Sequence, residues 1–282
     1  MAERTILVLG GGGVKGLTHV GAWRALREAG VAIHEILGTS IGALVGATIA
    51  GGSTTEELAT RARALAKADI VGLNRWALLL NGIRQPAIFR GEPLRNYIAG
   101  VLPVTEWDEL SIPFATNAVR LETGEMEWFG AGGRTDVPLV DAVNASCSLP
   151  VFYPPVELDG EYYVDGGVAD ALPLTRARER GATRVIAVDA GSGPVKDDRD
   201  TVEAGLIAIH HRVTDIMNYA RKQLQLAAWT GPELILVRPR LQGTSTFDFA
   251  RTGFFLEEGY RSMRAALGEH GLAAPLTEGA AD

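Results

Sequence analysis

The sequence predicts an α/β protein with a central, mostly parallel sheet, and two observations carry this prediction. The runs TILVLG at residues 5–10 and VAIHEILGTS at residues 31–40 are rich in β-forming apolar residues, as in strands buried on both faces of a sheet. Each run is followed by apolar residues at helical spacing, which end at Gly30 in the first case and at Ala50 in the second. Strand, glycine turn and helix, repeated in this order, favour parallel strand pairing.

The rest of the chain continues to alternate between strands and helices. Two pairs of strands are expected, one turning at Thr123-Gly124 within residues 113–130 and one turning at Asp159-Gly160 within residues 153–167. The other expected elements are a helix from 139 up to Pro150, a strand over 182–191, a long helix over about 202–228, a strand over 233–239 and a last helix over 254–268.

Three further segments carry local signals. Ser53 and Glu56 form a capping-box pattern at the start of a helix through residues 56–68. Residues 72–90, GLNRWALLLNGIRQPAIFR, are apolar and aromatic but interrupted by glycine and proline. They are expected either to pack on the core as a loop and short helix or to form a mobile cover over a substrate site. Residues 269–282 are expected to be a frayed tail.

Composition is typical of a soluble globular chain, and the length permits one or two domains. Because the sequence shows no linker or internal repeat, a single domain over 1–282 is expected, with a core of about 5–265. The chain has 282 residues, of which 46% are hydrophobic and 22% charged, and a chain of this length buries roughly 75% of its unfolded surface without disulfides. Cys147 is the single cysteine, which excludes an internal disulfide framework and a multi-cysteine zinc site. We expect Cys147 to be a small buried apolar residue.

Charge and hydropathy narrow the classes of partner. Lysine and arginine number 27 against 34 aspartates and glutamates, so the formal net charge is −7, which argues against nucleic acid as a partner. The start, MAERTILVLGGGG, lacks the regions of a signal peptide, and no run approaches about 18 consecutive apolar residues. The sequence therefore predicts a soluble, cytoplasmic protein, with any membrane contact peripheral. It carries no mark of the oligomeric state.

Three glycine-marked sites follow predicted strands, and the first is GGGGVKG at residues 10–16. Glycines here allow backbone N–H groups to point at one spot near the start of a helix. This geometry suits either the pyrophosphate of a dinucleotide or the oxyanion of an acyl-transfer intermediate. Gly11, Gly13 and Gly16 match the dinucleotide pattern G-x-G-x-x-G, and Glu35 follows at about the spacing of a ribose-binding acid.

The second site is the turn GTSIG at residues 38–42, which places Ser40 between a strand and a helix. A nucleophilic serine benefits from such an elbow, because the turn exposes Oγ and brings the next backbone N–H and the helix dipole near developing negative charge. Gly38 and Gly42 relieve crowding at so tight a turn. The alternative is a serine that caps the helix N-terminus, and the five residues alone fit both.

The third site is Asp165, followed by Gly166 and Gly167, at the end of a predicted strand. Asp165 is either a turn residue or the base that accepts a proton from Ser40. Acyl transfer needs a nucleophile, a base and an oxyanion hole, and the chain offers one candidate for each. Because all three follow strand ends, which meet at the carboxyl edge of an open parallel sheet, we expect them to converge.

These motifs, in this order, resemble the patatin-like phospholipase family over roughly residues 5–265. The resemblance rests on GGGVKG at 11–16, GTSIG at 38–42 and DGG at 165–167, together with NASCSLPVFYPPV at 144–156, which resembles the segment before the aspartate motif in bacterial members. It implies a three-layer α/β/α fold and a lipid acyl hydrolase of the phospholipase A, lysophospholipase or esterase type. The implied substrate is a lipid or another acyl ester, and no metal or organic cofactor is needed.

The resemblance also implies roles for individual residues. Ser40 is the nucleophile and Asp165 the general base of a dyad, and the amides of Gly11, Gly12 and Gly13 form the oxyanion hole. Lys15 stands where arginine is common in the family and keeps the charge without the planar fork. The residues that support the motifs are Lys15, Gly16, Gly38, Gly42, Gly166 and Gly167, the last standing where plant members have alanine.

The histidines allow the dyad to be weighed against a Ser–His–Asp triad. His210, His211 and His270 follow the acid in the sequence, as a triad histidine would. The first two fall in a predicted helix and the third near the tail, so the dyad is favoured. His19 is expected to be a packed or capping residue.

Two other functions stay open from the sequence. One is a dinucleotide-binding protein that uses Gly11 to Gly16, and the other is a non-catalytic lipid-binding or regulatory protein on the same fold. The apolar runs WALLLNGI at 76–83 and FDFARTGFF at 247–255 are expected either to pack in the core or to line an acyl channel. The sequence does not indicate the lipid head group, the length of the acyl chain or the position of the ester that is cleaved.

Overall fold

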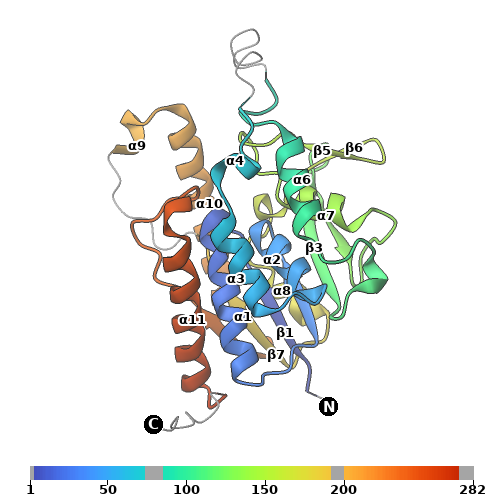
Figure 1. Cartoon of the computed structure of the whole chain (residues 1–282), viewed down its shortest axis with the longest axis vertical. Coiled ribbons are helices and arrows are strands. Elements are labelled where there is room, and N and C mark those ends of the chain that lie inside the picture. Colours follow the sequence, from blue (N-terminus) through green and yellow to red (C-terminus); the bar gives the residue numbers. More distant parts are fainter. Residues whose placement is uncertain (1–2, 74–84, 192–199, 273–282) are drawn as a thin grey trace.

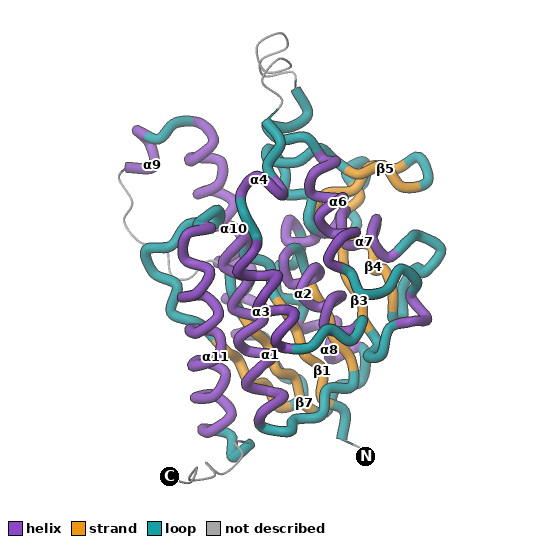
Figure 2. The backbone as a smooth tube through the Cα atoms, viewed as in Figure 1, coloured by secondary structure: helices purple, strands orange, loops and turns teal. Residues whose placement is uncertain are grey.

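The computed structural model describes residues 3–73, 85–191 and 200–272. Within them, one eight-stranded sheet lies between two layers of helices (Figures 1 and 2). The strands are β1 (Thr5–Leu9), β2 (Glu35–Gly38), β3 (Phe114–Arg120), β4 (Met126–Gly130), β5 (Val156–Leu158), β6 (Glu161–Asp165), β7 (Arg184–Val188) and β8 (Glu233–Val237). Their order is β5-β6-β3-β2-β1-β7-β8, with β4 paired to β3 off this path. This mostly parallel sheet confirms the predicted fold class.

Antiparallel pairing is confined to one end of the sheet. β1, β2, β3, β7 and β8 pair in parallel, whereas β4, β5 and β6 join through antiparallel ladders. The two strand pairs expected around Thr123-Gly124 and Asp159-Gly160 are confirmed as β3–β4 and β5–β6. Both hairpins turn through a glycine at positive φ, Gly124 at 75° and Gly160 at 83°.

Side chains of the central strands alternate between two apolar cores, because successive strand residues point to opposite faces of a sheet. Leu7 and Leu9 face one core, built with α1 (Thr18–Glu28), α2 (Ile41–Ala50), α3 (Thr55–Ala64) and α11 (Thr252–Glu269). Ile6 and Val8 face the other, built with α8 (Leu174–Glu179) and the end of α10 (Leu206–Ala227). The remaining helices are α4 (Lys67–Ile70), α6 (Gly91–Val101), α7 (Leu139–Ser146), α9 (Asp200–Glu203), η1 (Gly13–Leu17), η3 (Trp107–Glu109), η4 (Gly166–Val168) and η5 (Phe249–Arg251).

Two local predictions are wrong, each for a physical reason. The capping box of α3 uses Thr54 and Glu57 instead of Ser53 and Glu56, because Thr54 has the extended backbone of a cap while Ser53 is buried and accepts from Arg61. The long helix expected over about 202–228 is divided into α9 and α10 at Gly205, whose φ is 89°. The helix α6 was not predicted.

Some predictions fall outside the described residues. They concern most of the segment 72–90, the apolar run 76–83, and residues 273–282 of the expected tail. Within the described ranges, no helix combines the length and the apolar character needed to cross a bilayer.

Candidate active site

Ser40 lies on the sharp turn that joins β2 to α2. Its backbone angles, φ 56° and ψ −126°, fall in a region that residues other than glycine rarely adopt. Ser40 occupies the N-cap position of α2, but its side chain makes no capping hydrogen bond. The hydroxyl instead donates to Oδ2 of Asp165 over 2.6 Å. Ser40 is therefore the N-cap residue of α2 by its position, but its hydroxyl does not cap the helix and bonds to Asp165 instead.

Three glycines allow the chain to pass close enough for this turn to form. A Cβ on Gly38 would lie 2.4 Å from the carbonyl oxygen of Gly42, and a Cβ on Gly42 would lie 2.0 Å from that of Leu9. On the preceding loop, a Cβ on Gly16 would lie 2.1 Å from the side chain of Ile41. Such distances are shorter than any real contact, so only glycine lets α2 begin directly against β1 and η1.

Asp165 reaches Ser40 because β2 and β6 share one edge of β3. β2 pairs with the first half of β3, where Gly38 lies opposite Thr116, and β6 pairs with the second half, where Asp165 lies opposite Ala118. The two strands therefore run toward each other and end face to face. The expected convergence of the three motifs is confirmed, but the expected reason is wrong for Asp165, since β6 is antiparallel to the sheet that carries Ser40.

The carboxyl group of Asp165 is buried and receives hydrogen bonds from neutral donors. Its Oδ1 accepts from the amide of Gly167 over 2.7 Å, and its Oδ2 accepts from Ser40. Burial raises the pKa of Asp165 to about 6, against the opposing effect of these two hydrogen bonds. Gly166 lets the turn pack on Asn117, where a Cβ would lie 2.3 Å from Oδ1. The site thus holds a carboxyl group with the raised basicity that a general base needs.

The end of α7 holds the backbone of the elbow. The amide of Ser40 donates to Oγ of the fully buried Ser146 over 2.9 Å, and the thiol of Cys147 donates to the carbonyl of Ser40 over 3.1 Å. The carbonyl of Ser148 accepts from the amide of Asp165 over 3.0 Å. Cys147 is buried as expected, and burial raises the pKa of its thiol. Sequence reasoning quoted this NASCS segment but assigned these residues no role.

Asn117 was missed altogether. It is fully buried in β3, and its Oδ1 accepts from the hydroxyl of Thr39 over 2.8 Å while its Nδ2 donates to the carbonyl of Asp170 over 3.2 Å. These bonds tie the residue before Ser40 to the loop that follows Asp165. The signal was present in the sequence as an amide side chain inside a predicted strand, since buried polar groups need partners.

The glycine loop after β1 lies beside Ser40. A Cβ on Gly11 would be 3.4 Å from Cβ of Ser40. Gly11 itself donates its amide to the carbonyl of Ala171 over 2.9 Å, and Val14 donates to Thr246 over 2.8 Å. Among the described residues, the amides of Gly12 and Gly13 have no hydrogen-bond acceptor.

Among the described histidines, His210 and His211 line the same cavity as Ser40 and Asp165. His19 is buried and its Nε2 lies 2.8 Å from the carbonyl oxygen of Gly10, and burial lowers its pKa to about 4, which agrees with a packed residue. His211 contacts Thr246 through Nε2 and Asp215 through Nδ1. His270 lies beside Glu233 at the end of α11. Within the described ranges, no histidine hydrogen-bonds to Ser40 or Asp165.

A cavity of about 520 Å³ opens over Ser40 and Asp165. Its apolar lining includes Leu44, Leu65, Leu94, Tyr97, Phe152, Tyr153 and Phe247. Of the run 247–255, Phe247 therefore lines the cavity, whereas Phe255 is fully buried in the core. A largely apolar pocket with a few polar groups at one point is typical of a site for an apolar small molecule.

Charged side chains also line the cavity. Lys15 of η1 is almost buried there, and burial lowers the pKa of its ammonium group while Asp215 and Asp189 oppose that shift. Asp189 forms an ion pair with Lys222 at 2.6 Å. Within the described residues, no cluster of three or more side chains suits a metal ion.

Glu35 does not lie where a ribose-binding acid would have to be. It begins β2 beside Ile6, whereas the glycine loop follows the far end of β1. Its carboxylate is buried and paired with Arg4 at 2.5 Å and with Arg180 at 2.8 Å. Glu35 has the spacing of a ribose-binding acid in the sequence, but in the structure it lies at the opposite edge of the sheet from the glycine loop.

The chain belongs to the patatin-like phospholipase family, whose sequence model matches residues 7–178. An uncharacterized NTE family protein of Mycobacterium tuberculosis is 34% identical over 206 residues, which are 72% of this chain and 54% of that protein. Patatin-like phospholipase domain-containing protein 7 of Rattus norvegicus is 33% identical over 201 residues, 71% of this chain and 14% of that protein. The chain thus spans about half the length of the mycobacterial relative.

Two more distant comparisons agree with this assignment. Lysophospholipase NTE1 of Meyerozyma guilliermondii is 28% identical over 281 residues, covering 92% of this chain and 19% of that protein. The crystal structure of VipD from Legionella pneumophila superposes with a TM-score of 0.55 at 16% identity, covering 95% of this chain and 67% of that one. At this identity the likeness to VipD concerns the fold alone.

Proposed function

We propose that this protein is a carboxylic ester hydrolase acting on lipids, with Ser40 as nucleophile and Asp165 as general base. The observation that carries the proposal is the hydrogen bond of 2.6 Å from Ser40 Oγ to Asp165 Oδ2, made on a strained elbow beneath an apolar cavity. Membership of a family named for phospholipases supports the substrate class, as does the likeness to a lysophospholipase.

The proposed reaction has two steps. As Ser40 Oγ attacks the ester carbonyl, its proton passes to Asp165, and the collapse of the tetrahedral intermediate returns that proton to the departing alcohol. An acyl group then remains on Ser40. Water attacks this ester in turn and gives a proton to Asp165. As the second tetrahedral intermediate collapses, Asp165 returns that proton to Ser40 Oγ, which releases the fatty acid and restores the serine hydroxyl. Each step forms one bond to the acyl carbon and breaks one, and the protons balance within substrate, water and the dyad.

Backbone amides of the glycine loop are proposed to hold the oxyanion. Gly11, Gly12 and Gly13 were the expected donors, and because Gly11 already donates to Ala171, we assign the role to Gly12 and Gly13. These donors are fixed before the substrate arrives, so little reorganisation is needed as charge develops. The N-terminus of α2, which begins at Ile41, adds a favourable dipole at the same point.

The test combines covalent labelling with turnover. Wild-type protein should react with a fluorophosphonate probe and hydrolyse at least one member of a panel of phospholipid, lysophospholipid, triacylglycerol and p-nitrophenyl esters. Ser40→Ala should do neither, while Ser53→Ala, a serine that binds Arg61 away from the cavity, should retain both. Turnover that survives in Ser40→Ala would refute the assignment. Lipid binding without any turnover would favour a non-catalytic lipid-binding protein instead.

A further inference from the structure

The helix α10 presents an apolar stripe to solvent. None of its residues is buried, although it is a 22-residue helix between strands β7 and β8 of the sheet. Six of its apolar residues fall on one side of the helix by their spacing and are between 38% and 75% exposed. This apolar stripe consists of Leu206, Ile209, Val213, Ile216, Met217 and Leu224. In Figure 1, α10 descends from α9 at the upper left.

The polar side of α10 faces the protein. Thr214, Asp215, Asn218, Lys222 and Gln225 all line the cavity above Ser40. A surface helix ordinarily turns its apolar side to the core and its polar side to water. α10 has the reverse orientation, so residues 3–73, 85–191 and 200–272 give its apolar stripe no cover of the kind that such a face receives in a folded protein.

The apolar stripe continues into the mouth of the cavity. Met217 belongs to the stripe, is 53% exposed, and also lines the cavity. Val168 of η4, which is 39% exposed, lines the cavity as well, and the guanidinium of Arg221 on α10 donates to its carbonyl. The stripe therefore adjoins the cavity of the proposed active site at Met217.

The charge of α10 differs from that of the chain. The chain has a formal net charge of −7, but Asp215 and Lys222 of α10 face the cavity, where Lys222 pairs with Asp189, and the remaining charged residues of the helix are the cations Arg212 and Arg221. A helix with an apolar stripe, cationic flanks and no outward carboxylate is the arrangement that binds in the plane of a membrane containing anionic lipid.

We propose that the apolar stripe of α10 docks the protein on a lipid bilayer with the cavity mouth at the membrane surface. This inference rests on the proposed function, because it supplies the route by which a lipid reaches Ser40. From Leu206 to Leu224 a helix extends about 27 Å at 1.5 Å per residue and offers roughly 270 Å² on a face ~10 Å wide. A stable protein interface needs about 800 Å² from each partner, so the area favours a bilayer over a second copy of the chain.

The test uses flotation with phosphatidylcholine vesicles, prepared with and without phosphatidylglycerol. Wild-type protein should float with the vesicles, more strongly when phosphatidylglycerol is present. The double variant Leu206→Glu/Leu224→Glu should lose binding about tenfold or more, since two exposed leucines no longer enter the apolar layer. The matched control is Leu121→Glu, at a leucine of similar exposure in the turn after β3, and it should bind like wild type.

Enzymatic readouts separate this inference from the proposed function. In the double variant, hydrolysis of vesicle phospholipid should fall with binding, while turnover of a soluble p-nitrophenyl ester stays at the wild-type level. Vesicle binding that depends on the stripe in a protein without esterase activity would support docking and refute the hydrolase. Wild-type protein that does not float, or a double variant that floats equally well, would overturn docking. So would a wild-type dimer by light scattering that becomes monomeric in the double variant without any change in flotation.

Discussion

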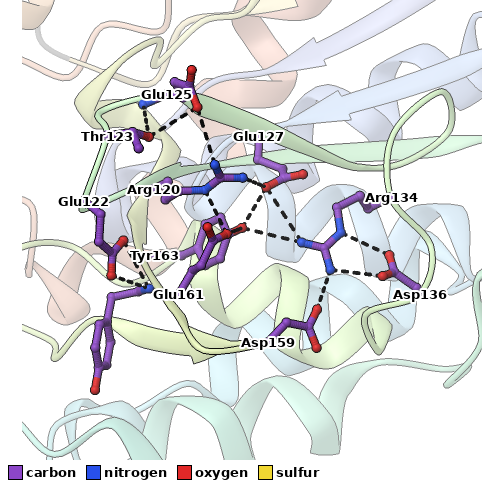
Figure 3. A network of polar contacts seen from close by, with 11 residues as sticks. Arg120, Glu122, Thr123, Glu125, Glu127, Arg134, Asp136, Asp159, Glu161 and Tyr163 are labelled. Carbon is purple, nitrogen blue, oxygen red and sulfur yellow. Dashed lines mark hydrogen bonds and ion pairs between the residues drawn. The ribbon is translucent and has the colours of Figure 1, made fainter.

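Two polar clusters of this protein hold carboxyl groups in opposite surroundings. At the proposed active site, the carboxyl of Asp165 is buried and bonded to two neutral donors, a hydroxyl and an amide. At the outer hairpins β3–β4 and β5–β6, Arg120 and Arg134 gather a group of partly exposed acids (Figure 3). These acids are Glu125, Glu127, Asp136, Asp159 and Glu161.

The surroundings decide what each carboxyl group can do. Asp136 is exposed and accepts two hydrogen bonds from Arg134, at 3.1 and 3.0 Å, which lower its pKa. Burial instead raises the pKa of Asp165. An ion-paired carboxylate is a weak base fixed in place, whereas a dry carboxylate held by neutral donors can take up a proton near neutral pH. Identical substitutions in the two clusters should therefore give different results.

The largest expected difference is in turnover. Asp165→Asn should lower kcat for a soluble ester by about 10³-fold, within the range attributed to general acid–base catalysis, because an amide cannot accept the serine proton. Asp136→Asn should leave kcat unchanged. Steady-state kinetics with both purified variants tests this, and near-normal turnover in Asp165→Asn would exclude Asp165 as the base.

The same pair of variants should differ in the sign of their effect on stability. The pKa of Asp165 rises from 3.8 to about 6 on folding, so ionisation of this group costs up to about 3 kcal/mol of stability above that pH. Asp165→Asn should therefore unfold at higher denaturant concentration than wild type at about pH 8. The difference should vanish below about pH 3, where Asp165 is protonated in both the folded and the unfolded state.

Asp136→Asn serves as the control with the opposite sign. The pKa of Asp136 is lowered in the folded protein, so its contribution is present above its unfolded pKa and is lost as the pH falls. This variant should be slightly less stable than wild type at neutral pH and equal to it in acid. Equal pH dependence in the two variants would contradict the contrast drawn between burial and ion pairing.

The pH dependence of turnover should report the raised pKa directly. Asp165 must be ionised to accept a proton, so kcat/KM for a soluble ester should fall about tenfold per pH unit below about pH 6. This acid limb of the pH–rate profile should be measured at constant ionic strength, with a substrate that does not titrate in this range. An acid limb near pH 4, the usual value for aspartate, would mean that the base is not buried in the active protein.

The features of the fold that could be predicted from the sequence are those that depend on short stretches of chain. The helix α2 was predicted over Ile41–Ala50 as the structure has it, from the residues of that short stretch alone. The buried strands β1 and β7 were predicted from continuous apolar runs. Such local patterns are set by neighbours in the sequence.

Contacts between distant segments could not be predicted. The face-to-face meeting of β2 and β6 on one edge of β3 depends on strand register, and no local pattern specifies it. Ser146 and Asn117 support the elbow through single hydrogen bonds to segments far away in the chain. The reversed orientation of α10 was equally hidden, because its periodicity is that of an ordinary amphipathic helix.

The smallest expected effect concerns the outer cluster itself. Arg134 lies over the ring of Phe129 and pairs with Asp136 and Asp159, but these pairs are partly exposed and screened by water. Arg134→Met keeps the apolar stem and removes the charge, so the melting temperature should fall by about 2 °C or less, with a smaller difference at high salt. Turnover should not change. A fall of tens of degrees in the melting temperature, or a loss of esterase activity in folded protein, would show that the outer cluster supports the active site. Solvent access alone would then not explain the difference between the outer cluster and the active site.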